Sequence, residues 1–172
     1  MPPLARRDDR DLPFAKDHLT AGPGLLLDTS VYIDILQGCA PPEVRRLMEI
    51  RQVNHSSIAL TELSHLFGRL DPAHPDTKAV LAPIAATIAD IPPHRLSAPS
   101  IRAAAEAGII TGVIARLTGI ARIDRQPLLN DASLFLQALE RGFVLLSANI
   151  RDIDLIDQLV PDGRMLLYRK LL

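Results

Sequence analysis

Short runs of consecutive apolar residues recur along the chain, each ended by a polar or turn-forming residue. The clearest is Leu25-Leu26-Leu27, which ends at Asp28. A run of this kind predicts a strand that is buried on both faces, as in a parallel sheet. By the same pattern we expect strands at 53–57, 95–98, 143–147 and 165–168.

Between these runs, apolar residues return every three or four positions, which predicts amphipathic helices. In 127–141 the apolar stripe consists of Ala132, Phe135, Leu136 and Leu139. Strands that alternate with helices predict βαβ units. The predicted fold class is therefore α/β, a three-layer α/β/α arrangement with a mostly parallel sheet of four or five strands. The other expected helices cover 29–38, 41–52, a segment from 58 onward, 75–90 and 99–119.

The first 24 residues differ from the rest of the chain. They contain four prolines, mixed charges and the break Gly22-Pro23-Gly24, which together predict an N-terminal arm or tail outside the core. Residues 25–172 are long enough to form one domain with a core of its own. No run approaches the ~20 apolar residues of a membrane span, so we expect a cytoplasmic protein with no membrane partner.

Composition narrows the classes of function. Aromatic residues make up 3% of the chain and hydrophobic residues 48%, which predicts an aliphatic core. The net charge of −1 offers no general attraction to a long nucleic-acid duplex, although a local arginine patch can still meet phosphates. The single cysteine, Cys39, excludes an intramolecular disulfide and a cysteine metal cage.

Polar residues at the ends of the predicted strands indicate where chemistry takes place. In open parallel sheets, ligands bind at the carboxyl ends of the strands. Asp28 ends the first strand, Glu62 lies early in the helix after the second, and Asp131 opens the helix before the fourth. Ser147 and Asn149 follow that fourth strand. We expect these side chains to converge on one rim of the sheet.

Three convergent carboxylates repel one another strongly unless a cation lies between them. Oxygen ligands without cysteine or histidine favour a hard ion, Mg²⁺ or Mn²⁺. In a nucleic-acid site such an ion aligns a water molecule and stabilises charge on the phosphate oxygens. Asp28, Glu62 and Asp131 are therefore the candidate metal ligands and catalytic residues.

A simpler interpretation exists for some of these residues. Asp28 and Asp131 are placed where an aspartate caps a helix, a role worth about 1 kcal/mol. Asn149 follows a strand and is equally well placed as a turn residue. Glu62 resists such an explanation, because an unpaired half-buried carboxylate on an apolar helix is costly.

Four motifs in order resemble those of PIN domains, in particular the VapC-type toxin ribonucleases of type II toxin–antitoxin systems. They read LLLDTSVY at 25–32, SSIALTEL at 56–63, NDASL at 130–134 and GFVLLSANIRD at 142–152. The resemblance covers about residues 25–168. Each motif alone is weak, and the specificity comes from their order and their expected positions on strands and helices.

The resemblance implies a metal-dependent endoribonuclease that hydrolyses single-stranded RNA to products with a 5′-phosphate and a 3′-hydroxyl. It also implies Mg²⁺ or Mn²⁺ as cofactor and a cognate antitoxin that blocks the site, and we expect a homodimer. The catalytic positions of the family fall on Asp28, Glu62, Asp131 and Asn149. The residues expected to support them are Thr29, Ser30, Ser147 and Asp152.

The chain also departs from the family pattern. Asn149 is neutral where many members have Asp, and Asp152 or Asp154 are candidates to compensate. This departure supports an alternative, a PIN-like RNA- or protein-binding module with weak or lost catalysis. Haloacid-dehalogenase-like phosphatases are disfavoured because they need a second Asp two residues after the first, where this chain has Ser30.

Two further expectations concern surfaces. Helix 41–52 beside the helix that starts at Ile58 is expected to form an apolar groove for the antitoxin, with Leu47 and Leu66 lining it. Gly108 and Gly112 are expected to let a neighbouring helix of the same chain approach closely.

Overall fold

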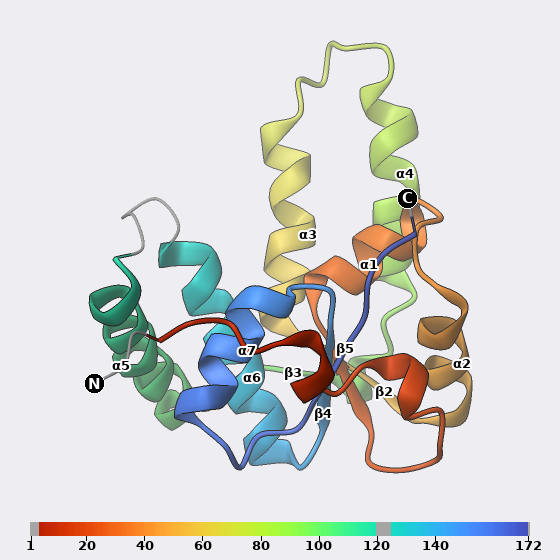
Figure 1. The fold of residues 1–172 in the computed structure, drawn as a ribbon. Helices are drawn as coiled ribbons and strands as arrows, with labels where there is room; N and C mark the ends of the chain where they lie inside the picture. Colours follow the sequence, from red (N-terminus) through yellow and green to blue (C-terminus); the bar gives the residue numbers. More distant parts are fainter. Residues whose placement is uncertain (1–3, 120–124, 172) are drawn as a thin grey trace.

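A five-stranded sheet forms the centre of the molecule (Figure 1), in a computed structural model that describes residues 4–119 and 125–171. All neighbouring strands are parallel, in the order β3-β2-β1-β4-β5. The predicted α/β class and parallel sheet are thereby confirmed. The strands are β1 (Leu25–Leu27), β2 (Val53–Ser56), β3 (Leu96–Ser97), β4 (Val144–Ser147) and β5 (Met165–Leu167).

Helices cover both faces of this sheet, and each face has its own core. Leu26 points to one face and Leu25 and Leu27 to the other, as alternation along a strand requires. The helices are α1 (Thr29–Leu36), α2 (Pro42–Ile50), α3 (Ser57–Arg69), α4 (Thr77–Ala89), α5 (Ile101–Thr118), α6 (Arg125–Arg141) and α7 (Ile150–Leu159).

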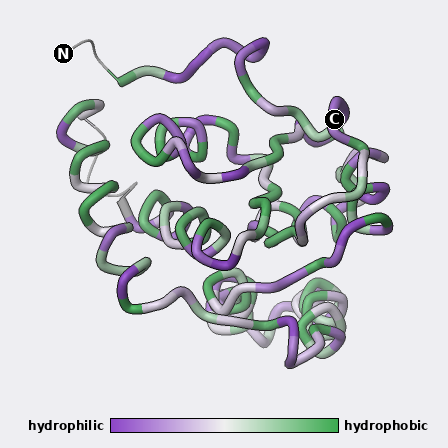
Figure 2. The backbone as a smooth tube through the Cα atoms, turned by 90° about the horizontal axis from the view of Figure 1, so that it is seen from below, coloured by the Kyte–Doolittle hydropathy of each residue, from purple (hydrophilic) through white to green (hydrophobic). Residues whose placement is uncertain are grey.

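Different helices cover the two faces of the sheet. Residues of α5, α6 and α7 pack against the face that contains Leu26, and residues of α1 to α4 pack against the face that contains Leu25. Green and purple segments follow one another along the helices in Figure 2, as expected where one side of a helix meets the sheet. In Figure 1, α3 and α4 run side by side and project away from the sheet. No helix within the described ranges is long and apolar enough to cross a membrane.

Two expectations about helix surfaces are wrong. Leu47 on α2 is fully buried in the core, so it does not line a surface groove. Gly108 and Gly112 on α5 have open space beside them, with no atom within 4 Å of an added Cβ, so no neighbouring helix approaches there. Both predictions were based on the apolar pattern of a helix. That pattern does not distinguish a helix face that packs against the core from one that lies at the surface.

The N-terminal arm is bound to the domain along β5 and α7. Leu12, Phe14 and Ala15 are buried, which corrects the expectation that the whole arm lies outside the core. The Leu167 N–H donates to the Pro13 carbonyl at 2.9 Å, and Phe14 pairs with Leu167 as a parallel bridge. The arm therefore continues the sheet beyond β5.

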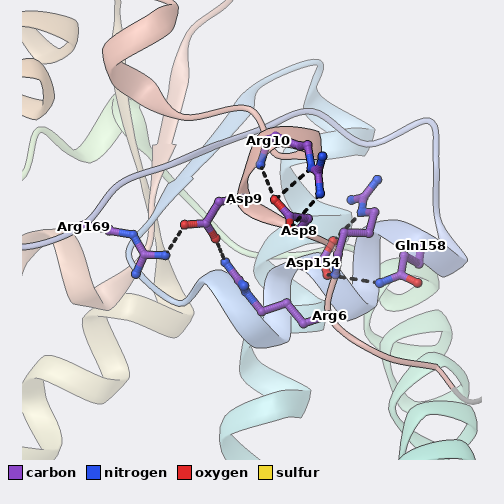
Figure 3. Close-up of polar contacts among 8 residues, drawn as sticks. Arg6, Asp8, Asp9, Arg10, Asp154, Gln158 and Arg169 are labelled. Atoms are coloured by element: carbon purple, nitrogen blue, oxygen red, sulfur yellow. Dashed lines mark hydrogen bonds and ion pairs between the residues drawn. The ribbon is translucent and has the colours of Figure 1, made fainter.

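Ion pairs with α7 hold the start of the arm. The Arg7 side chain donates to Asp154 at 2.5 Å and also to Asp157, and the Arg7 backbone N–H donates to Asp154 at 2.8 Å. The Gln158 side chain, one turn further along α7, also donates to Asp154 at 3.1 Å, as Figure 3 shows. Asp154 is fully buried, so this charge depends on Arg7 for its neutralisation.

Removal of Arg7 should therefore destabilise the protein. In Arg7→Ala the buried Asp154 loses its cationic partner, and we expect a loss of about 2 kcal/mol, below the full effect for a buried pair because Arg7 is partly exposed. Arg10→Ala removes an arginine that pairs at the surface with Asp8, and should change stability by less than about 0.5 kcal/mol. Urea unfolding gives the free energy of unfolding of both variants. If Arg7→Ala and Arg10→Ala are equally stable, the arm is not anchored through Arg7.

Candidate active site

The candidate site lies where the strand order reverses. From β1 the sheet continues in one direction through β2 to β3 and in the other through β4 to β5. Such a switch point opens a crevice at the carboxyl ends of the two central strands. The register pairs Leu27 with Leu146, so Asp28 and Ser147 emerge next to each other. This rim of the sheet is the one predicted from the strand ends.

Asp28 is buried and accepts three hydrogen bonds. Its donors are the Thr29 backbone N–H, the Ser30 hydroxyl and the Ser147 hydroxyl, each at 2.6 Å. Burial raises the pKa of Asp28 most strongly and the charge of Glu62 adds to it, while these hydrogen bonds oppose the rise. Asp28 is also the N-cap of α1, so the capping interpretation holds and is compatible with a functional role.

Glu62 projects from α3 toward the same rim. Its carboxylate accepts from the Thr29 hydroxyl and, at 2.5 Å, from the Asn130 side-chain amide. Thr29 follows β1 and Asn130 lies on α6, so Glu62 connects three separate elements. This explains why a half-buried carboxylate occurs on an otherwise apolar helix.

Asp131 is a second carboxylate of the group whose pKa is raised. Burial, and then the charges of Asp28, Asp152 and Glu62, raise the pKa of Asp131 to about 9, and a hydrogen bond from Asn149 opposes the rise. The three neighbouring charges act on Asp131 because Asp28, Asp152 and Glu62 lie close to it in a poorly solvated place. The four acidic side chains therefore share one site.

Asn149 links Asp131 to Asp152. Its side-chain N–H groups donate to Asp131 at 2.7 Å and to Asp152 at 3.1 Å, and its oxygen accepts the Asp152 backbone N–H at 3.4 Å. Asn149 is thus the N-cap of α7 and a bridge between two carboxylates at once. Because the Asn149 side chain is neutral, it adds no further negative charge beside Asp131 and Asp152, as an aspartate at this position would.

No protein-family profile and no curated protein matches the sequence, whereas solved structures do. One is a chain of VapBC2 from Rickettsia felis bound to promoter DNA, 14% identical over 84% of this chain and 98% of that chain, with a TM-score of 0.58. Another, DNA-bound VapBC from Salmonella typhimurium, is 22% identical over 84% and 97%, with a TM-score of 0.56. FitAcB from Neisseria gonorrhoeae is 18% identical over 83% and 96%, also with a TM-score of 0.56.

The chain has the PIN-domain fold. The resemblance seen in the motifs is thereby confirmed at the level of the fold, because the match covers almost the whole of each solved chain. Within the PIN fold, the predicted site residues do lie together. Hydrogen bonds or mutual charge effects connect Asp28, Thr29, Ser30, Glu62, Asp131, Ser147, Asn149 and Asp152.

Several expectations about individual residues need correction. Asp131 does not open its helix, because α6 begins at Arg125 and places Asp131 in the second turn. Asp154 does not compensate for Asn149, since it is fully buried and paired with Arg7 of the arm. Asn130 holds Glu62, a role that its position one residue before Asp131 did not reveal.

His55 is engaged away from the carboxylates. Its Nδ1 lies 2.7 Å from the Tyr32 hydroxyl, and burial lowers the pKa of His55. The two rings line a separate small cavity together with Met48 and Ile91. His55 therefore does not belong to the carboxylate site.

The donor set fits a hard divalent cation in its chemistry. Asp28, Glu62 and Asp131 offer oxygen only. Burial raises the pKa of Asp131 most strongly and neighbouring carboxylates add to the rise, and a bound cation would favour the ionised form against both effects. Within residues 4–119 and 125–171, no three Asp, Glu, His or Cys side chains are already spaced to hold a metal. The carboxylate oxygens face serine, threonine and asparagine donors, so they would have to turn from these to a metal.

The raised pKa of Asp131 has a consequence for stability. Without metal the folded state holds a proton on Asp131 that the unfolded state has lost, so the free energy of unfolding should fall as pH rises from about 4 to about 9. Asp131→Asn removes the contribution of Asp131 to this dependence and should be at least about 1 kcal/mol more stable than the wild type at pH 8.

Urea unfolding in the presence of EDTA at pH 5 and pH 8 measures this effect. The surface substitution Asp162→Asn is the matched control and should leave the pH dependence of the wild type unchanged. If the wild type and Asp131→Asn lose the same free energy of unfolding as the pH rises, Asp131 is not the group that causes the pH dependence.

Proposed function

We propose that the chain is a Mg²⁺- or Mn²⁺-dependent endoribonuclease of the VapC toxin type, which hydrolyses phosphodiesters of single-stranded RNA. The observation that carries the proposal is the convergence of Asp28, Glu62 and Asp131 at the switch point of a PIN fold. The solved relatives in fold are toxin–antitoxin complexes, which supports the same conclusion.

The protein's own groups fix where the carboxylates lie. Ser30 and Ser147 hold Asp28, Thr29 and Asn130 hold Glu62, and Asn149 holds Asp131. Mg²⁺ or Mn²⁺ held by the three carboxylates would align a water molecule and stabilise charge on the phosphate. The supporting donors come from the start of α1, from α6, from the end of β4 and from the N-cap of α7. The carboxylates are therefore positioned by segments that directly follow the two central strands and by α6.

The alternative function also has an observation in its favour. Asn149 and the hydroxyl groups close a hydrogen-bonded network around the carboxylates without any cation. A network of this kind suits a PIN-like module that binds RNA or protein with weak or lost catalysis. Cleavage measurements separate the two functions.

Loss of one carboxylate should abolish cleavage. In Glu62→Gln the side chain keeps its size and loses the anionic oxygen, and we expect the rate of RNA cleavage in Mn²⁺ to fall by at least about a hundredfold. Glu49→Gln removes an exposed glutamate on α2 and should cleave like the wild type. Denaturing gels of a labelled RNA give both rates. Wild-type activity in folded Glu62→Gln would contradict the metal-dependent mechanism, and an inactive wild type that binds RNA would favour the alternative.

We further propose a cognate antitoxin, which would bind an apolar groove between α1, α3 and α4. The groove has a volume of about 400 Å³, and Ile33, Leu36, Leu63, Leu66, Val80 and Ile84 line it. It replaces the predicted groove on α2, where Leu47 is buried. Its position beside α1 and α3 adjoins the helices that carry Thr29 and Glu62, so a partner here can reach the carboxylates.

A charge in this groove should weaken the complex. Leu66→Asp places a carboxylate in the apolar lining, and we expect antitoxin affinity to fall by about tenfold or more. Phe67→Asp is the matched control, since Phe67 is the next residue on α3 and is 41% exposed outside the groove. Titration calorimetry measures both affinities, and an equal effect of the two substitutions would place the partner elsewhere.

The homodimer and the cytoplasmic location remain predictions. On α5 the side chains of Ile101 and Ile109 are 92% and 68% exposed, and Gly108 and Gly112 lie open beside them. An exposed apolar strip of this kind is typical of a protein interface. We propose α5 as the dimer contact, which reverses the expectation that its glycines pack within the chain.

A further inference from the structure

A second cavity adjoins the carboxylates and ends at two basic residues. Its volume is about 690 Å³, and it is lined by Ser30 and Asn149 at the catalytic rim and by Arg169 and Lys170 after β5. Ser30 donates to Asp28 and Asn149 donates to Asp131, so the cavity begins at the groups that hold the proposed metal ligands. A molecule bound in it would touch both the acidic site and the basic pair.

The charge of this cavity differs from that of its surroundings. The chain as a whole carries −1, and the carboxylates of the site add further negative charge. The one acidic residue in the cavity wall is Asp34, which is 5% exposed and accepts the Tyr168 hydroxyl at 2.8 Å. Arg169 and Lys170 are exposed, and they give this end of the cavity a positive charge.

The N-terminal arm fixes Arg169 in place. The Arg169 guanidinium donates to Asp9, and it lies 5.7 Å from the centre of the Phe14 ring. Figure 3 shows Arg169 and Arg6 approaching Asp9 from two sides. Phe14 in turn is buried and bridged to Leu167. An arginine side chain ordinarily loses much freedom on binding, so one already held in position binds a ligand at lower cost.

Arg169 retains donors for a further anion. A guanidinium has five N–H groups in a planar fork that matches phosphate oxygens, and the bond to Asp9 uses only its terminal nitrogen Nη2. Lys170 adds a second positive charge to the same cavity wall. Two cations at one end and metal-binding carboxylates at the other suit a chain of phosphates, in which one phosphate reacts and another anchors the strand.

We propose that Arg169 and Lys170 bind a backbone phosphate of the RNA strand beside the one that is cleaved, and that the arm positions Arg169 for this contact. The inference rests on the proposed ribonuclease function. In this arrangement the bound RNA strand extends from the carboxylates toward the C-terminal segment of the protein. It also assigns the arm a role in substrate binding, with Asp9 as a positioning residue.

The salt dependence of RNA binding tests this inference without cleavage. Fluorescence anisotropy of a short fluorescein-labelled single-stranded RNA in EDTA gives the affinity at several NaCl concentrations. Loss of one phosphate contact should reduce the magnitude of the slope of log affinity against log salt by about 0.7, so Arg169→Gln combined with Lys170→Gln should reduce it by about 0.7. We expect each single substitution to weaken binding by about fivefold to tenfold at low salt.

Matched controls exist for both residues. Arg46 is as exposed as Arg169, at 61%, and pairs with one carboxylate in the same way, while Lys78 is exposed on α4, so Arg46→Gln and Lys78→Gln should leave the slope unchanged. Asp9→Asn keeps every positive charge and frees Arg169. It should therefore keep the slope, weaken binding by about threefold, and raise KM in cleavage assays while leaving kcat unchanged.

The outcomes separate this inference from the proposed function. If the wild type cleaves RNA and Arg169→Gln and Lys170→Gln behave like their controls, the ribonuclease stands and the basic pair has no role in substrate binding. The same holds if the slope is unchanged and only antitoxin affinity falls, which would assign the pair to the protein partner. If the wild type neither binds nor cleaves RNA, both proposals fail.

Discussion

The burial of carboxylates beside like charge is the constraint on which the rest of this structure depends. Burial is the largest cause that raises the pKa of Asp131 to about 9, and the charges of Asp28, Asp152 and Glu62 raise it further. Such a group is unfavourable for folding, since each charge is both poorly hydrated and close to like charge. The hydroxyl and amide donors around it reduce the cost, and a divalent cation would remove most of it.

The fold offsets this cost by packing elsewhere. Two aliphatic cores, one on each face of the sheet, hold β1 and β4 in register, and that register places Asp28 beside Ser147. The arm adds a further attachment at β5 and α7, through Phe14 and the Arg7–Asp154 pair. It lies at the edge of the sheet that leads to Arg169, so the same segment stabilises the C-terminal strand and holds Arg169, which lines the cavity beside the site.

Much of the site could be predicted because it depends on strand ends. Continuous apolar runs identified β1 and β4, and the rule that parallel strands deliver their carboxyl ends to one rim placed Asp28 and Asn149 together. The contact of Asn130 with Glu62 could not be predicted in this way, because it depends on how α6 is rotated against α3. The packing of the arm against the domain could not be predicted for another reason. Leu12 and Phe14 are isolated apolar residues among prolines and charges, without the periodicity that signals a buried element.

The sequence also could not predict which apolar helix faces are buried and which are exposed. The apolar faces of α2 and α5 have similar patterns, yet Leu47 is buried and Ile109 is 68% exposed. Periodicity shows that a helix has an apolar side, and only the tertiary arrangement decides whether the sheet, another helix or a partner covers it. For the same reason the groove for a partner moved from α2 to the space between α1, α3 and α4.

Proton release on metal binding tests the central claim most directly. With a pKa of about 9, Asp131 carries a proton at pH 7, and a carboxylate must lose its proton to become a ligand. Titration calorimetry of the wild type with Mn²⁺ at pH 7, in two buffers of different ionisation enthalpy, counts the protons released. The account predicts the release of about one proton per Mn²⁺ bound, and little release in Asp131→Asn. Tight Mn²⁺ binding without proton release, or no binding at all, would contradict it.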